Sequence, residues 1–160
     1  MGKQNLYESG MKVPLIFAGP DIPAGQRRHA LCYLTDVYAT VGELAGVKPP
    51  NGCEGRSLAS VIAENEKSVR SHIITGYRDV QRAVTDGRWK LIRYPQVNVT
   101  QLFDLDSDPH EMADLSAKPE HADRVKELLA LMRREQAAHG DRQPLEVANP
   151  KPAAWSPPGQ

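Results

Sequence analysis

The chain has 160 residues, which is enough for one domain or for one part of a larger protein. Its 20 Lys and Arg residues balance 20 Asp and Glu residues, so the formal net charge is zero. Nucleic acids and membrane surfaces attract proteins through charge of one sign, and this balance therefore argues against both as partners.

The first third of the chain predicts one strand and one helix. Residues 13–18 are an apolar segment typical of a strand with cover on both faces, and too little chain precedes it to build such a sheet. Residues 34–45 have helical spacing, with Thr35 or Asp36 as the N-cap and Gly46 as the stop. The residues that recur at this spacing are Val37, Tyr38, Val41, Leu44 and Ala45.

The middle of the chain predicts a small antiparallel sheet. A short helix at 57–63 and a solvated, charged connector lead to a strand at 72–75. The segments 81–84 and 88–94 flank an Asp86-Gly87 pair, one of the strongest short signals for a hairpin. Residues 100–105 supply a further strand, so three or four strands are expected.

A long helix is expected after the sheet, from Pro119 to His139, and Gly140 should end it. Beyond it, repeated prolines predict an extended or disordered tail. The fold class is therefore α+β: a small antiparallel sheet packed by a C-terminal helix, preceded by a strand and a helix. The apolar stripe of the helix, which should cover one sheet face, comprises Ala122, Val125, Leu128, Leu129 and Met132.

Candidate sites for chemistry are few, and we expect neither a metal site nor a cofactor site in this chain. The spacing of Asp104, Asp106 and Asp108 resembles a calcium loop, but Pro109 stands where that loop needs Gly and Leu115 where it needs Glu. A capped acidic turn explains it better. The five His and two Cys lack metal-ligand spacing, and neither a Gly-rich phosphate loop nor a Gly-x-Ser-x-Gly motif occurs.

Four segments, in chain order, carry motifs of one known family. Residues 2–16 contain Gly-Lys, Tyr-Glu and Lys-Val-Pro-Leu-Ile, and residues 35–47 are similar to an Asp-Leu-Tyr-Pro-Thr helix that ends in Leu-Ala-Gly, with Ala39 in place of the proline. Residues 55–58 are similar to a Gly-x-Ser-Leu segment, and residues 102–115 to a Phe-Asp-Leu-x-x-Asp-Pro-x-Glu block, with Asp114 where asparagine is usual. Together these segments resemble the C-terminal portion of type I sulfatases, members of the alkaline phosphatase superfamily.

The resemblance implies hydrolysis of a sulfate ester or sulfamate by a longer parent, in which an aldehyde hydrate attacks sulfur while cations stabilise the oxyanions. Lys3 corresponds to the lysine that binds a sulfate oxygen. The formylglycine and Ca2+ expected in the parent would come from an N-terminal sulfatase domain that this chain lacks, so the chain alone is expected to be inactive. The expected partners are that domain and a sulfated small molecule or sugar.

The resemblance also implies a division of the chain. Residues 1–65 would be the C-terminal edge of the family's large α/β domain, so the expected strand and helix would be a remnant of that domain. Residues 66–140 would be the antiparallel subdomain and 141–160 a Pro-rich tail. Two other functions stay open: a non-catalytic binding or assembly module, and the equivalent part of a phosphodiesterase or phosphonate hydrolase of the same superfamily. The parent could be periplasmic, secreted or cytoplasmic.

Overall fold

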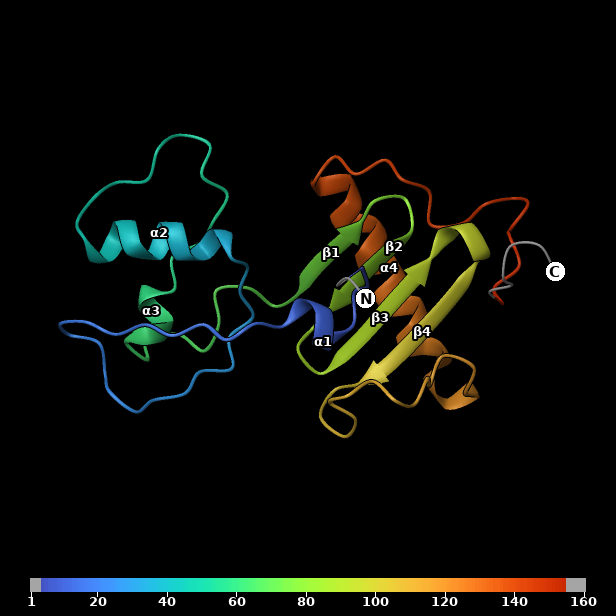
Figure 1. Cartoon of the computed structure of the whole chain (residues 1–160), viewed down its shortest axis with the longest axis horizontal. Helices are drawn as coiled ribbons and strands as arrows, with labels where there is room; N and C mark the ends of the chain where they lie inside the picture. The colour runs from blue at the N-terminus through green and yellow to red at the C-terminus, as the bar shows by residue number, and fades with distance from the viewer. Residues whose placement is uncertain (1–3, 155–160) are drawn as a thin grey trace. The chain divides into compact units, whose positions relative to one another are not determined.

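A computed structural model describes residues 4–154, which fall into two compact units (Figure 1). One unit comprises residues 13–73, and the other joins the described parts of 1–12 and 74–160. These units follow contacts within this chain. The expected division at residues 65 and 140 concerns the domains of a longer parent, and it remains a prediction.

A four-stranded sheet forms the centre of the larger unit, and it confirms the expected α+β class. Its strands lie in the order of the sequence, and β2–β3 and β3–β4 pair antiparallel. Asp86 closes the β2–β3 hairpin by accepting hydrogen bonds from the N–H groups of Arg88 and Trp89, and Gly87 adopts a φ of 101°. The strands are β1 (Ile73–Tyr77), β2 (Gln81–Thr85), β3 (Trp89–Tyr94) and β4 (Val99–Asp104).

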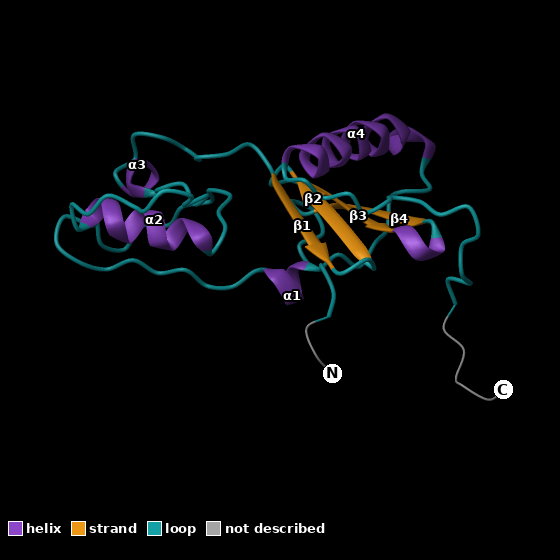
Figure 2. Ribbon diagram, turned by 90° about the horizontal axis from the view of Figure 1, so that it is seen from above, coloured by secondary structure: helices purple, strands orange, loops and turns teal. Residues whose placement is uncertain are grey.

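Helix α4 (Ala122–Ala138) covers one face of the sheet, as Figure 2 shows, and a 3-10 turn, Pro119–His121, precedes it. Gly140 follows the helix with a φ of 68°, as expected of a terminating glycine. Leu128 and Met132 of the expected stripe are fully buried, whereas Ala122 is exposed. The core between helix and sheet comprises Val84, Leu91, Leu102, Leu128, Met132 and Leu145.

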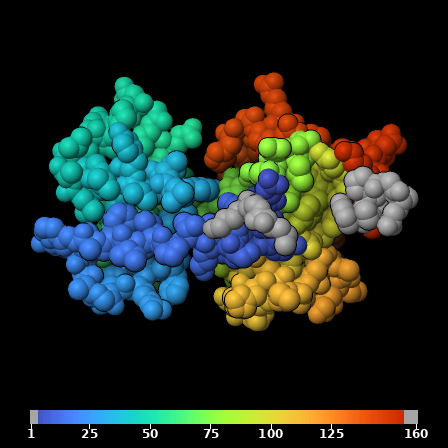
Figure 3. Space-filling model, viewed as in Figure 1, coloured from blue at the N-terminus to red at the C-terminus, as the bar shows by residue number. Residues whose placement is uncertain are grey.

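The N-terminal segment lies on the opposite face of the sheet, in blue over the green strands in Figure 3. Leu6 is buried there against Ala83, Ile92 and Phe103. The short helix α1 (Glu8–Met11) follows directly. Alternate residues of β3, such as Leu91 and Ile92, thus face two different apolar layers.

The smaller unit contains helices α2 (Thr35–Leu44) and α3 (Ala59–Ile62). The strand expected at residues 13–18 is wrong: the segment has no regular structure, and Ile16 is 85% exposed. A strand needs a hydrogen-bonded neighbour, and none lies beside this segment among the described residues.

The apolar residues that recur along α2 do not form its buried face. Tyr38 and Val41 are 60% and 53% exposed, whereas Asp36, Ala39 and Thr40 are buried. Neither expected N-cap holds, because Leu34 occupies the cap position. The interior of this unit is organised by hydrogen bonds to Asp36 and Thr40, and these bonds turn the polar side of the helix inward.

The segment after α4 is extended, but its described part is not disordered. Leu145 is buried in the core, and its carbonyl accepts a hydrogen bond from Arg93 at 2.6 Å. Asn98 and Val147 exchange hydrogen bonds at 2.8 and 3.0 Å. Residues 155–160 lie outside the described range. The described helices include none with the length and apolar character needed to cross a bilayer.

Candidate functional site

The candidate sulfate-binding residue, Lys3, lies outside the described residues. The described part of the site is therefore the segment that follows it, residues 5–12, which we name the anchor segment. Its contacts determine where the chain that carries Lys3 is attached to the fold.

The anchor segment is bound to the sheet through both backbone and side chains. The buried N–H of Leu6 donates to Gln81 Oε1 at 3.0 Å, and the hydroxyl of Tyr7 donates to Gln101 Oε1 at 2.7 Å. The Tyr7 ring also packs edge-on against Phe103, with 5.8 Å between ring centroids. Leu6 and Tyr7 are thus fixed against three strands, β2 to β4.

Glu8 is held by a cluster of three charged residues, Glu8, Lys90 and Glu111, which we name the Lys90 cluster. Lys90 Nζ lies 2.8 Å from Glu8 Oε1 and 2.9 Å from Glu111 Oε1. The other oxygen of Glu111, Oε2, accepts the backbone N–H of Glu8 at 2.5 Å. The side chains of Lys90 and Glu111 are only 3% and 1% exposed. Charges buried this deeply persist only when they are paired, so the three groups depend on one another.

The acidic segment after β4 is a hydrogen-bonded turn, as the interpretation of a capped acidic turn expects. Arg88 donates to both oxygens of Asp104 at 3.0 and 2.9 Å and lowers the pKa of that carboxyl. Asp108 accepts the N–H of Ala113, and Asp114 accepts those of Leu102 and Ser116. The carboxylates of this acidic segment therefore hold the turn in which Glu111 lies beside Lys90.

A second buried ion pair lies within the smaller unit. Arg70 donates to both carboxylate oxygens of Asp36, which also accept the N–H groups of Tyr33 and Arg56 at 2.7 and 2.8 Å. Burial by itself raises the pKa of Asp36, but these hydrogen bonds outweigh it and the pKa is lowered overall. We expected residues 64–70 to be a solvated connector. That is wrong for Arg70, whose side chain is 7% exposed.

Hydrogen bonds of Thr40 join the second and third resembling segments, residues 35–47 and 55–58. The hydroxyl of Thr40 donates to the carbonyl of Asp36 at 2.6 Å and accepts the N–H of Leu58 at 2.9 Å. At Gly55, a Cβ atom would lie 2.2 Å from the carbonyl oxygen of Thr35, so only glycine fits this approach. Asp36, Thr40 and Gly55 are therefore structural residues in this chain.

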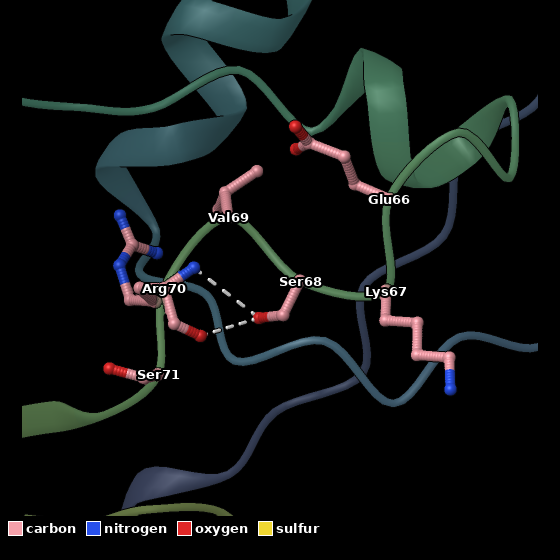
Figure 4. A pocket seen from close by; sticks show the side chains of 6 residues that line it. All are labelled: Glu66, Lys67, Ser68, Val69, Arg70 and Ser71. Carbon is pink, nitrogen blue, oxygen red and sulfur yellow. Dashed lines mark hydrogen bonds between the residues drawn. The ribbon is translucent and has the colours of Figure 1, made fainter.

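A shallow, open hollow lies at one consecutive segment of the smaller unit, residues 66–71 (Figure 4). The hydroxyl of Ser68 donates to the carbonyl of Arg70 at 2.7 Å, which forms a local turn. The charged groups of Glu66 and Lys67 point in different directions. This hollow brings no set of reactive groups together.

The described residues do not fit the formylglycine or the Ca2+ of a sulfatase. Among residues 4–154, no three His, Cys, Asp or Glu side chains are placed to hold a metal ion. Asp36 and Asp104 are already bound to arginines. Cys32 and Cys53 are free, and burial, with a contribution from Asp36, raises the pKa of the Cys32 thiol. The Cys32 thiol therefore lacks the lowered pKa of an activated nucleophile.

The Lys90 cluster was not predicted from the sequence. Lys90 is one position of an expected strand, and Glu8 and Glu111 belong to separate resembling segments. Their placement in two such segments was a signal for contact. Pairing two acidic residues more than 100 positions apart nevertheless requires the sheet, because Lys90 lies between them.

Comparison with known proteins gives one family for nearly the whole chain. A family model described as "N-sulphoglucosamine sulphohydrolase, C-terminal" matches residues 1–138. A protein from Formosa agariphila named "Sulfatase" is 30% identical over 130 residues, covering 81% of this chain and 25% of that protein. "Arylsulfatase K" from Homo sapiens is 31% identical over 130 residues, covering 72% and 24%. The chain thus spans about a quarter of the length of these relatives.

Solved structures agree with this result. The crystal structure of a putative sulfatase from Bacteroides thetaiotaomicron superposes with a TM-score of 0.76 at 29% identity, covering 86% of this chain and 32% of that one. BT4656, in complex with its substrate D-glucosamine-2-N,6-O-disulfate, gives 0.59 at 27% identity, covering 69% and 25%. The phosphonate monoester hydrolase of Silicibacter pomeroyi gives 0.74 at 21% identity, covering 89% and 32%, a likeness of fold alone.

Proposed function

Because the chain belongs to the N-sulphoglucosamine sulphohydrolase C-terminal family, and is thus the C-terminal domain of a sulfatase, we propose that its parent hydrolyses sulfate esters or sulfamates. Within the parent, this chain would supply a sulfate-binding lysine and part of the substrate rim. The observation that carries the proposal is the anchor segment, in which every residue from Leu6 to Glu8 has a defined partner.

Lys3 is the residue proposed to bind sulfate. An ammonium group is a compact point charge with three donors, and it can follow negative charge as it develops on a leaving oxygen. Such a group is useful only if its position is fixed before the reaction begins. The anchor segment supports this role because Leu6, three residues after Lys3, is buried and hydrogen-bonded.

The nucleophile and the metal would come from the rest of the parent. Type I sulfatases use a formylglycine and Ca2+, and the described residues of this chain fit neither. We therefore propose that the chain has no turnover by itself. A sulfated sugar is the substrate class we favour for the parent, since BT4656 binds a doubly sulfated glucosamine.

Sulfate release tests the proposal. The 160-residue chain and the full-length parent would be assayed with aryl sulfates and with sulfated amino sugars. We expect turnover by the parent only, and loss of at least about a hundredfold in its kcat when Lys3 is replaced by alanine. Turnover by the isolated chain, or full activity of Lys3→Ala in the parent, would contradict the proposal.

A phosphonate or phosphate diester hydrolase is the second candidate, and the fold likeness to the Silicibacter pomeroyi enzyme favours it. Both reactions place a cation against an oxyanion, so Lys3 would serve either one. Phosphonate monoesters and phosphate diesters assayed beside the sulfate esters would separate the two. A higher kcat/KM for the phosphorus substrates would establish the second function.

A further inference from the structure

We propose that Lys90 is a positioning residue whose buried ammonium group holds the anchor segment on the sheet and thereby fixes the point from which the chain continues to Lys3. This inference rests on the proposed function, because it concerns how the sulfate-binding lysine is held. Lys90 itself is buried and would touch no substrate.

Lys90 is a suitable fixed point because it lies in the middle of the sheet. Strand β3 pairs with β2 on one side and with β4 on the other, and Lys90 is opposite Thr85 and Phe103 in those pairings. A residue held by two neighbouring strands moves little, and its side chain is directed toward the same face as Ile92. The anchor segment lies on that face.

The cluster is built so that Glu8 has two attachments. Its carboxylate binds Lys90, and its backbone N–H binds the carboxylate of Glu111. Glu111 adopts a φ of 55°, a left-handed backbone conformation that residues other than glycine rarely take. Its own N–H donates to the carbonyl of Asp108 at 3.1 Å. The turn therefore holds Glu111 in an unfavourable backbone conformation that places its carboxylate between Lys90 and Glu8.

Lys3 is connected to this cluster by a short length of chain. It lies three positions before Leu6, and three residues of extended chain span at most about 11 Å. Release of Leu6 and Glu8 from the sheet would free the attachment point of the lysine. Because a displacement of about 1 Å can cost a reacting group much of its effect, loss of the anchor should reduce the rate of the chemical step.

Amide hydrogen exchange in the 160-residue chain tests whether Lys90 holds the segment. In Lys90→Met, the amides of Leu6 and Glu8 should exchange at least about tenfold faster, while amides within α4 keep their rates. Glu8→Gln removes one charge of the cluster without changing its size, and it should act in the same direction should Lys90→Met fail to fold. The matched control is Lys126→Met, because Lys126 is 78% exposed on α4.

Two exchange results would overturn the proposal. The first is unchanged rates at Leu6 and Glu8 in Glu8→Gln and in any folded Lys90→Met. The second is an equal acceleration of all amides in both variants, which would mean that the cluster supports global stability only.

A double-mutant cycle in the full-length parent tests whether Lys90 acts through Lys3. Lys90→Met should lower kcat with little change in KM, and it should have no further effect on kcat in a Lys3→Ala background. If the losses in kcat of the two single variants instead multiply in the double variant, the positioning role of Lys90 is overturned and the function of Lys3 stands. Full activity of Lys3→Ala would overturn both the positioning role and the sulfate-binding role. The two failures are therefore distinguishable.

Discussion

Arg70 donates hydrogen bonds to both carboxylate oxygens of Asp36, and this ion pair joins positions 34 residues apart within the smaller unit. The same carboxylate accepts the backbone N–H groups of Tyr33 and Arg56. Asp36 therefore fixes the residues just before α2, the loop before α3 and the segment that leads to the sheet. A single buried side chain thus organises a unit that has little apolar interior.

Asp36→Asn should destabilise the smaller unit strongly. Breaking a buried ion pair by removing one charge costs about 3–5 kcal/mol, because the remaining charge of Arg70 is left uncompensated. Amide exchange at Arg56 and Leu58, together with thermal unfolding, would measure the loss. The control is Asp123→Asn, since the Asp123 side chain is 98% exposed and its pair with Lys126 contributes little. Similar stability of the two variants would contradict the structural role of Asp36.

Gly55→Ala should also destabilise this unit, by steric conflict alone. The added Cβ would lie 2.2 Å from the carbonyl oxygen of Thr35, so the backbone at the start of α2 must shift, at a cost of about 1–3 kcal/mol. Gly19→Ala is the matched control, because its nearest neighbour would be a side-chain atom of Ile22 at 3.7 Å. Denaturant unfolding of the two variants would compare them, and an unaffected Gly55→Ala protein would show that the approach to Thr35 is not tight.

The sheet and the last helix could be predicted from the sequence because their signals are local. Asp86-Gly87 fixes a hairpin, and the apolar spacing around Leu128 and Met132 fixes a helix with one buried face. The Tyr7-Glu8 pair could be found only through resemblance. Its partner Lys90 required the fold, because residues far apart in sequence meet there only after the sheet has formed.

The wrong prediction at residues 13–18 and the exposure of the apolar residues along α2 have one physical cause. Apolar segments are normally taken as core because apolar residues are usually buried. In this unit the buried positions are instead held by polar contacts between Asp36, Thr40 and the chain around Leu58. Hydrophobic periodicity carries no information about such contacts.

Substitutions on α2 can distinguish the two faces of the helix. Val41→Lys should change the free energy of unfolding of this chain by no more than about 0.5 kcal/mol, since Val41 is 53% exposed. Ala39→Lys should cost about 3 kcal/mol or more, because Ala39 is 4% exposed and a charge would be buried there. Chemical denaturation would measure both. A larger loss of stability for Val41→Lys than for Ala39→Lys would mean that the apolar residues, and not Ala39, form the buried face of α2.

The pH dependence of stability should show the ion pair between Arg82 and Asp141, which fixes the chain after α4. Arg82 donates to both oxygens of Asp141 at 2.6 and 3.1 Å, and Gln136 adds a third hydrogen bond. The Arg82 hydrogen bonds lower the pKa of Asp141 far below its ordinary value, against a smaller opposing effect of burial. The unfolded chain therefore binds a proton at higher pH than the folded chain does. The resulting stability is fully present above about pH 4 and is lost as the pH falls further, toward the folded-state pKa.

The Asp141→Asn variant should accordingly be less stable than the unsubstituted 160-residue chain at neutral pH, by about 1–3 kcal/mol. The effect is moderate because the side chain of Asp141 is 26% exposed and the ion pair is partly screened. The difference should narrow as the pH falls below about 4, because the aspartate is then progressively protonated in the unfolded state. Urea unfolding at a series of pH values would measure it, with Asp123→Asn as the exposed control. A difference that stays constant down to the acid limit would mean that Asp141 stabilises the fold by its shape and not by its charge.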